Sequence, residues 1–286
     1  MGADDHGPAP LPVRTTRHLR PGRHSSPHQL SLPSTAPALV LAVPGSASQE
    51  SEELAAEIAD SAGSSCPGAT ITAGYLAGDE NRLTDILDGL PNGEGSRLPA
   101  VVVPLLTSPH PEMDAALAAA VAASARPTLV AGHLGPHPFL AEAVHARLSE
   151  AGLARAGRSG RISIVTAADG VVVGGIGEPE EALQAAGVVS VLLASRLTIP
   201  AVPALLNDRF GLRDAAERLQ AAHVTRVALA PCVIGPEVPP AAMAAISAET
   251  GLECSPTLGG YPTIGQLVAI RYGAALEDPK LADVSG

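Results

Sequence analysis

The sequence predicts an α/β protein of two tandem units, each a parallel sheet covered by helices. Short aliphatic runs alternate with segments that have the spacing of amphipathic helices, a pattern typical of βαβ units. Hydrophobic residues make up 46% of the chain and aromatic residues only 2%, so the core consists of Ala, Val and Leu, which suits helices packed on a parallel sheet. Segments of the first half also recur in the second half, which indicates a pseudo-twofold internal repeat.

The elements of the first half follow from aliphatic runs and helical spacing. The run ALVLAVPGS, residues 38–46, predicts a strand that ends in a Pro-Gly-Ser turn, and residues 48–62 have one apolar helical face. The other predicted elements of this half are strands at 69–76, 100–106 and 128–131, helices at 83–90, 113–125 and 139–151, and a glycine-rich loop at 92–96.

The second half repeats these motifs in the same order. RISIVTAADG at 161–170 resembles the first strand, and the prolines Pro104 and Pro231 end matching aliphatic runs. The elements expected in this half are strands at 188–194 and 226–230 and a helix at 212–222. We therefore expect a first domain at 38–154, a linker at 155–161, a second domain at 161–276, and tails at 1–37 and 277–286.

Charge and composition argue against nucleic-acid and nucleotide-hydrolase functions. The net charge is −11 and the pI about 5.2, which opposes binding to a phosphate backbone, and few aromatic rings are present to stack on bases. Lys280 is the only lysine, so no GxxxxGK[ST] phosphate loop exists in the domains. We expect no nucleic-acid partner.

Cysteine usage and hydropathy favour a cytoplasmic protein without a membrane span. Cys66, Cys232 and Cys254 are an odd number at wide spacings, without a CxxC pair. No apolar run reaches about 18 residues, and the N-terminus lacks the apolar stretch of a signal peptide.

The tail at 1–37 is rich in Pro, Ser, Arg and His and has too little apolar surface to fold, so we expect it to be disordered. Four histidines lie there, which suggests metal binding, although their irregular spacing favours a tail with scattered histidines. They are His6, His18, His24 and His28.

The segment AVVVPLLTSPHPEMD, residues 100–114, is the strongest candidate for a site. A buried strand ends there, and His110 and Asp114 follow it at the start of a helix. Ligands bind beyond the carboxyl ends of the strands in open α/β sheets, so His110 is a candidate base and metal ligand. The alternative is that His110 is a turn residue at a helix entry. Asp114 is expected to hydrogen-bond the His110 ring, as an outer partner of a ligand does.

The repeat suggests carboxylates that face His110 from the second domain. Glu237 lies six residues beyond Pro231, as His110 lies six beyond Pro104, and Asp169 aligns near the end of the first strand. An imidazole with two carboxylates suits Co²⁺ or Fe²⁺. The alternative is that both are solvated loop carboxylates.

Four further histidines and two glycine-containing segments are weaker candidates. His133 and His137 are interpreted as turn residues, and His145 and His223 as surface residues. Gly45 and Ser46 form a turn before a helix, where free backbone N–H groups can bind a carboxylate of a ligand. The glycines at 174–177 do not have GxGxxG spacing, which argues against a dinucleotide site.

The chain resembles the class II tetrapyrrole chelatases, the sirohydrochlorin and cobalt chelatases, in their long two-domain form. The resemblance rests on ALVLAVPGS, on PLLTSPHPEMD with its HxxxD spacing, on the LGPHP turn, and on the recurrence of APCVIGP and LGGYP; it covers about residues 38–276. It implies a chelatase-like α/β fold. His110 matches the second of two family histidines, whereas Pro44 stands where the family has the first.

The resemblance implies insertion of Fe²⁺ or Co²⁺ into sirohydrochlorin in sirohaem or cobalamin biosynthesis. The metal would be a co-substrate, with no tightly bound cofactor, and the product could pass to a sirohaem-dependent reductase. Because Pro44 offers neither a base nor a ligand, a catalytically impaired relative that binds tetrapyrrole or metal as carrier or regulator remains open. An unrelated α/β enzyme on the same scaffold also remains open.

Overall fold

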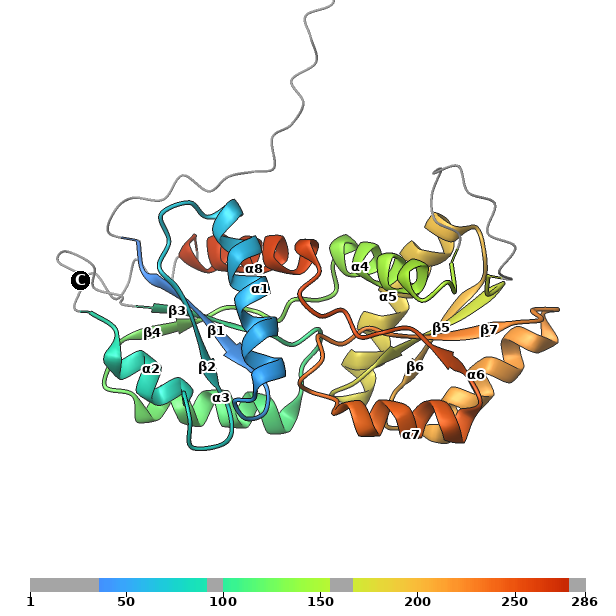
Figure 1. Ribbon diagram of the computed structural model, residues 1–286, viewed down its shortest axis with the longest axis horizontal. Helices are drawn as coiled ribbons and strands as arrows, with labels where there is room; N and C mark the ends of the chain where they lie inside the picture. The colour runs from blue at the N-terminus through green and yellow to red at the C-terminus, as the bar shows by residue number, and fades with distance from the viewer. Residues whose placement is uncertain (1–35, 92–99, 155–166, 278–286) are drawn as a thin grey trace, which may run out of the picture.

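Two four-stranded parallel sheets form the framework of the chain, and helices cover both faces of each (Figure 1). The computed structural model describes residues 36–91, 100–154 and 167–277. The strand order is β2-β1-β3-β4 in the first sheet and β6-β5-β7-β8 in the second. All strand pairs are parallel. The predicted α/β fold with a repeated parallel-sheet unit is confirmed.

The two halves have the same order of elements. The first half contains β1 (Ala38–Val43), α1 (Gln49–Ser65), β2 (Ile71–Tyr75), α2 (Leu83–Gly89), β3 (Ala100–Pro104), α3 (Pro111–Ala123), β4 (Thr128–Val130) and α4 (Pro138–Glu150). The second half contains β5 (Gly170–Gly175), α5 (Pro179–Leu197), β6 (Ala201–Leu205), α6 (Arg209–Ala221), β7 (Val227–Pro231), α7 (Pro240–Thr250), β8 (Glu253–Cys254) and α8 (Pro262–Leu276).

Helices cover both faces of each sheet, and the central strands are accordingly apolar on both faces. Residues 39–43 of β1 and 100–104 of β3 are buried, as expected for strands inside a parallel sheet. Alternate residues belong to different cores: Leu39 and Leu41 pack into the larger core, and Val40 packs with α2 and α3.

The last helix of each half packs on the other half. Helix α8 lies against α1 and β3 of the first half, whereas α4 lies against α5 and β7 of the second (Figure 1). The larger core is therefore continuous from one sheet to the other and includes residues of both halves. The sequence repeat gave no sign of this exchange, because a helix that follows β4 is equally compatible with either sheet.

Specific hydrogen bonds hold the exchanged helices. The buried Tyr272 of α8 donates its hydroxyl hydrogen to the carbonyl of Pro37, 2.7 Å away. Arg147 of α4 donates from Nε and Nη2 to the carbonyl of Leu258, at 2.9 and 2.8 Å. The start of α8 is joined to α1 by the Ser61 hydroxyl, which donates to the carbonyl of Pro262 at 2.7 Å.

One predicted element of the second half is wrong. Residues 188–194 lie inside helix α5 and are not a strand. The segment 161–170, which resembled β1, lies mostly outside the described residues, and the first strand described in this half is β5 at 170–175. Its sequence GVVVGG was not predicted to be a strand, and glycine is uncommon in strands. The predicted tail, linker and glycine-rich loop fall mostly outside the described residues.

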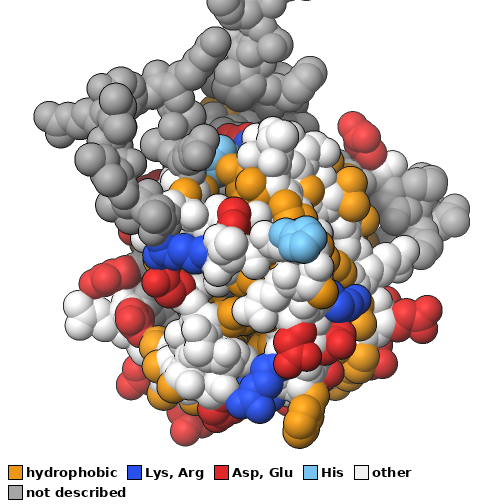
Figure 2. All heavy atoms as spheres, turned by 90° about the vertical axis from the view of Figure 1, so that its right-hand side faces the viewer, with side chains coloured by type: hydrophobic (Ala, Val, Ile, Leu, Met, Phe, Trp, Pro, Cys, Tyr) orange, Lys and Arg blue, Asp and Glu red, His pale blue; other side chains and the backbone are white. Residues whose placement is uncertain are grey.

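The end of the molecule formed by the second half carries paired charges. Figure 2 shows basic side chains close to acidic ones on this face, and the ion pairs of this half include Arg209 with Glu249 and Arg218 with Asp214. None of the helices in the described residues is both long enough and apolar enough to span a bilayer.

Candidate functional site at the facing strand ends

The two sheets direct the carboxyl ends of their central strands toward each other. In the first sheet Ala42 of β1 lies opposite Pro104 of β3, and in the second Gly174 of β5 lies opposite Pro231 of β7. Counting from these pairs, the turn residue Gly45 is equivalent to Gly177. Because the two sheets share this register, loops of the two halves can be compared residue by residue.

The loops contact each other reciprocally. A Cβ on Gly45 would lie 3.8 Å from the carbonyl oxygen of Pro236, and one on Gly177 would lie 2.2 Å from that of Pro109. The amide of Glu178 also donates to the Pro109 carbonyl at 2.8 Å. Since Pro109 and Pro236 each lie five residues beyond the strand-ending prolines, the contacts are related by the pseudo-twofold axis.

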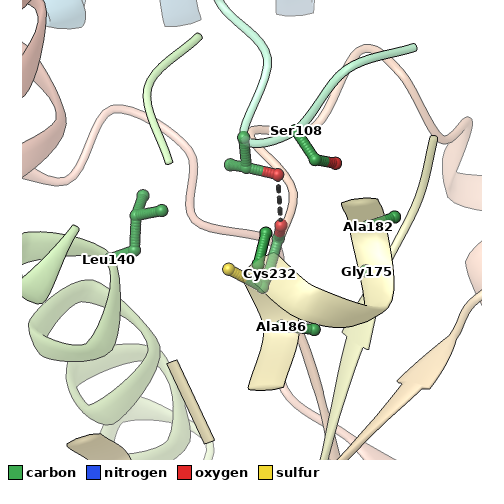
Figure 3. A pocket seen from close by; sticks show the side chains of 8 residues that line it. Ser108, Leu140, Gly175, Ala182, Ala186 and Cys232 are labelled. Carbon is green, nitrogen blue, oxygen red and sulfur yellow. Dashed lines mark hydrogen bonds between the residues drawn. The ribbon is translucent and has the colours of Figure 1, made fainter. Parts of the chain in front are cut away.

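A small cavity lies where these loops meet α5 (Figure 3). It is lined by Thr107, Ser108, Leu140, Gly175, Ala182, Ala185, Ala186 and Cys232. The Thr107 hydroxyl donates to the carbonyl of Cys232 at 2.7 Å, the dashed line in Figure 3, and the Ser108 hydroxyl donates to the carbonyl of Ile176 at 2.6 Å. The cavity of about 10 Å³ holds at most about one water. The junction is therefore too small for an organic ligand.

His110 lies at the outer edge of the junction, directly before α3. It has extended backbone angles, φ −134° and ψ 103°, and its amide donates to Oδ2 of Asp114 at 2.8 Å. The ring is partly buried, and Nδ1 is fully buried without a hydrogen-bond partner in the described chain. A buried polar atom without a partner is uncommon in native proteins, and a catalytic role or an ordered water can explain it.

Asp114 connects the backbone of His110 with the imidazole of His133. Its Oδ2 accepts from the backbone of His110 and not from the ring, contrary to the sequence expectation, while its Oδ1 lies 2.8 Å from Nε2 of His133. His133 follows β4, the neighbour of β3 in the sheet. Both side chains of this pair are partly exposed, 25% for His133 and 33% for Asp114. The second imidazole of this edge is thus His133.

His133 was assigned to a structural turn because the matching motif LGGYP has no histidine. The argument that selected His110 applies to it equally: each histidine follows the carboxyl end of a strand of the first sheet. Neighbouring parallel strands deliver their carboxyl-end loops to the same edge. Applied to the predicted strand at 128–131, this rule would have identified His133 as a candidate site residue.

Glu237 caps its own loop. Its Oε1 accepts from the amide of Ile234 at 2.7 Å and its Oε2 from the amide of Gly235 at 2.8 Å. Burial raises the pKa of Glu237, and the backbone hydrogen bonds lower it by less. The Glu237 side chain is therefore a partly buried anchor of its own loop, and it occupies the position equivalent to His110.

Asp169 lies at the opposite edge of the second sheet. It precedes β5 and accepts from the amides of Thr225 and Arg226, which precede β7. These hydrogen bonds lower its pKa to about 2. Because amino ends and carboxyl ends of parallel strands lie at opposite edges, Asp169 does not join His110. The sequence alignment failed here because it took 161–170 for the first strand.

A three-ligand metal centre is accordingly absent from the described ranges: no group of three or more His, Cys, Asp or Glu side chains there could hold a metal ion. The predicted set of His110, Glu237 and Asp169 is not assembled. Burial raises the pKa of the neighbouring Cys232 thiol to about 12.

The turn predicted at Gly45 and Ser46 is present. Gly45 has φ +78°, a conformation that favours glycine, and its carbonyl accepts from the amide of Ala77 at 2.9 Å. Ser48 caps α1 through a capping box with Ser51. These contacts hold the turn at the junction, beside the loop of Pro236.

The two histidines that were predicted to lie at the surface differ in their exposure to solvent. His223 is exposed, as expected. His145 on α4 is partly buried, and its Nε2 is buried without a hydrogen-bond partner among the described residues. His145 lies on α4, which packs against α5 and β7 of the second half.

The fold with its facing strand-end loops is similar to that of known chelatases. Residues 38–151 match the CbiX family model. The sirohydrochlorin chelatase SirB from Bacillus subtilis subspecies spizizenii in complex with cobalt superposes with a TM-score of 0.56 and 14% identity over 85% of this chain and 97% of that chain. SirB from Bacillus subtilis with Fe³⁺ has a TM-score of 0.58, 14% identity and the same coverage.

A third similar structure is CbiX, the terminal enzyme for biosynthesis of siroheme in denitrifying bacteria, with a TM-score of 0.56 and 17% identity over 84% of this chain and 100% of that chain. No curated protein sequence matches this chain significantly. The described residues therefore have the fold of these chelatases, and residues 38–151 match the CbiX family model.

Proposed function

We propose that this protein is a chelatase-like protein that inserts a divalent metal, Fe²⁺ or Co²⁺, into a sirohydrochlorin-type tetrapyrrole. The observation that carries the proposal is the His110 ring, which lies at the carboxyl edge of β3 with a buried, unpartnered Nδ1. The similarity to sirohydrochlorin chelatases supports the substrate class. A product of this kind would serve sirohaem or cobalamin biosynthesis, for instance by transfer to a sirohaem-dependent reductase.

The reaction defines what the residues must do. Two pyrrole N–H protons leave the macrocycle and the metal replaces them, so the balanced products are the metallated tetrapyrrole and two protons. The metal also has to lose its water shell. A neutral imidazole can accept a proton or coordinate the metal, and we assign both tasks to His110. In the proposed mechanism the metal is a substrate that His110 and the tetrapyrrole nitrogens hold during transfer.

Pro44 stands at the position where the family resemblance implies the first histidine. Proline has neither a base nor a ligand, so a second group must accept a proton. We assign this task to His133, whose Nε2 is hydrogen-bonded to Asp114. A carboxylate oriented on an imidazole stabilises the charged ring once it has accepted a proton. The pair faces the same edge as His110.

A second candidate function is a carrier or regulator that binds the tetrapyrrole or the metal without turnover. The specific observation that favours it is the loop after β1, where Pro44 stands and no imidazole is available. The chelatase fold and the strand-end edge would then be used for binding alone.

The two functions are separated by an insertion assay. Purified protein is mixed with sirohydrochlorin and Co²⁺ or Fe²⁺, and the absorbance change is followed for wild type and His110→Asn. If the chain is a chelatase, wild type inserts metal faster than the uncatalysed reaction, and His110→Asn slows it by about 10²-fold or more.

The control is His223→Asn, because His223 is exposed and has φ +66°, a conformation that asparagine also adopts. It should insert metal at the wild-type rate. A wild-type rate equal to the uncatalysed one rejects the enzyme, and saturable tetrapyrrole binding in the same sample then supports the carrier. Equal rates for wild type and His110→Asn remove His110 from the mechanism.

A further inference from the structure

Arg271 of α8 has a guanidinium group that forms no ion pair with a carboxylate of the described residues. Its Nη2 donates to the carbonyl of Leu134 at 3.1 Å. Its Nε is buried and has no hydrogen-bond partner in the part of the chain that the structure describes. By contrast, several other arginines are ion-paired within the chain: Arg82 with Asp85, Arg196 with Glu142, and Arg209 with Glu249.

The internal repeat supplies a matched comparison. Helices α4 and α8 begin at Pro138 and Pro262, an offset of 124, so Arg271 is equivalent to Arg147. The environments correspond: Arg147 donates to the carbonyl of Leu258, the residue equivalent to Leu134. Both guanidinium groups thus bind the Leu-Gly turn of the other half.

The two sites differ in the acidic partner of the arginine. In the first copy Nη1 of Arg147 lies 2.7 Å from Oε2 of Glu150, one turn further along the helix. The residue equivalent to Glu150 is Ala274. A cavity of about 160 Å³ lies at this place, between α8 and the edge strand β4. The second copy therefore has the cation and an open space where the first copy has the carboxylate.

The cavity lining indicates the kind of ligand. It consists of Leu129, Val130, Ala131, Gly132, Arg271, Ala274 and Ala275. Among the described residues, the guanidinium is the only charged group in this lining, and the remaining walls are aliphatic or glycine. Val130 is 41% exposed, so the cavity is reached from solvent. Its volume corresponds to roughly five waters, which suits a two- to four-carbon chain with one carboxylate and not a whole macrocycle.

We propose that Arg271 and this cavity form a binding site for an organic carboxylate, which takes the place that Glu150 occupies in the first copy. The planar guanidinium pairs with a carboxylate through two parallel N–H···O bonds, and the short aliphatic chain contacts Leu129 and Val130. The carboxylate belongs either to a side arm of a tetrapyrrole bound at the His110 edge or to a free small acid. The site exists whether or not the chain inserts a metal.

His137 supplies a local reporter. It is equivalent to Tyr261, over whose ring Arg147 lies at 5.9 Å. Its Nδ1 accepts from the amide of Phe139 at 3.1 Å. Burial lowers the pKa of His137, and the positive charge of Arg271 lowers it further. A carboxylate bound to Arg271 compensates that charge, so the pKa of His137 should rise on binding.

The test is a titration with sodium propionate, monitored by NMR of the His137 imidazole, with sodium chloride at equal ionic strength as reference. Wild type should show saturable shifts with a Kd of about 1–10 mM, as expected for one charge-assisted pair. Ala274→Glu installs the acid of the first copy, and its carboxylate should occupy the guanidinium and weaken propionate binding by about tenfold or more. Arg271→Gln should abolish binding.

The control is Arg213→Gln on α6, which removes an arginine remote from the cavity and should leave the propionate Kd unchanged. A second arm measures sirohydrochlorin binding without metal. Tenfold weaker sirohydrochlorin binding by Ala274→Glu identifies the ligand as a tetrapyrrole arm; an effect on propionate alone identifies a free acid. If Ala274→Glu binds both as wild type does, or if no saturable shift occurs, the site does not exist. Metal insertion is measured separately, so loss of chelatase activity alone leaves this result intact.

Discussion

At the scale of single residues, Asp114 holds the geometry of the candidate site. One carboxylate oxygen accepts from the His110 backbone at the start of α3, and the other lies against His133. The carboxylate therefore fixes two neighbouring loops relative to each other and complements the positive end of the α3 dipole. Substitutions at this position should affect both catalysis and stability.

The proposed role of His133 predicts a selective loss of turnover. His133→Ala should lower kcat for metal insertion by about 10–100-fold, with a smaller change in the KM for sirohydrochlorin, because the ring acts on the proton and not on substrate affinity. The measurement is steady-state absorbance kinetics. His133→Gln, which can still hydrogen-bond Asp114 but is a poor base, should be as slow as His133→Ala; wild-type turnover by the glutamine variant would assign His133 a purely structural role.

Asp169 predicts a defined pH dependence of stability. The pKa of this carboxyl is about 2 in the folded chain, below its ordinary value of 3.8, because the backbone of Arg226 and of Thr225 donates to it. The unfolded chain binds the proton more tightly, so the carboxylate stabilises the fold above about pH 4 and this contribution is lost as the pH falls toward 2.

Asp169→Asn should therefore lower Tm at pH 7, and the difference in Tm from wild type should shrink between pH 4 and pH 2. Thermal unfolding followed by circular dichroism measures it. Asp214→Asn on the exposed face of α6 is the control and should change Tm little. A Tm difference for Asp169→Asn that is constant down to pH 2 would show that the charge is not the cause.

Residue-level prediction from sequence succeeded where a local rule was sufficient. A histidine after an aliphatic strand was recognised at His110, and a turn at Gly45. The partner of Asp114 was mistaken because the pairing depends on which strand lies beside β3, and that information is not local. Arg271 escaped notice for the same reason, since its environment combines α8 of the second half with β4 of the first.

At the scale of elements, the packing of α1 on α8 depends on a glycine. A Cβ on Gly265 would lie 2.5 Å from Cβ of Ser61 and 2.7 Å from the backbone nitrogen of Ala62, so the helices approach too closely for any larger residue. Gly187 in α5 is also helical, but a Cβ there would meet only Pro203, at 3.9 Å.

The two glycines predict opposite effects of one substitution. Gly265→Ala should destabilise the fold by about 1–2 kcal/mol, because overpacking outweighs the gain in helix propensity. Gly187→Ala should be neutral or stabilise by up to about 1 kcal/mol. Urea unfolding gives both free energies. A stabilised Gly265→Ala would mean that α8 does not pack on α1 as described.

Element prediction failed where an apolar run was compatible with two structures. The run VVSVLLA in α5 contains β-branched residues and resembles a buried strand, but the buried positions Ala182, Ala186, Val189 and Leu193 recur with helical spacing. Short apolar runs do not distinguish a buried strand from a buried helix. Extending the window back to Pro179-Glu180-Glu181, a helix start, would have resolved it.

At the scale of the whole molecule, the exchange of α4 and α8 joins the two halves into one folding unit. Each sheet is covered on one face by a helix from the other half, and the main core runs through both. The sequence repeat predicts two similar units. It does not indicate whether the last helix of each unit packs on its own sheet or on the other one. The exchange also builds the Arg271 cavity, which contains residues from both halves.

This exchange predicts cooperative unfolding. Leu267 of α8 is fully buried in the main core, so Leu267→Ala should destabilise the fold by about 2–5 kcal/mol. Because α8 belongs in sequence to the second half and packs on the first, the loss should reach both sheets. Native-state hydrogen exchange should show an equal fall in the opening free energy of the most protected amides of β1 and of β5.

Leu219→Ala is the matched control, since Leu219 is buried in the core between the second sheet and α6. If the chain unfolds as one unit, this variant also lowers the protection of β1 and β5 together, although its side chain is confined to the second half. If the halves unfold independently, Leu219→Ala lowers protection in β5 only and calorimetry shows two transitions. That result would mean that the exchanged helices dock too weakly to couple the sheets, and the Arg271 cavity would then open whenever either half unfolds.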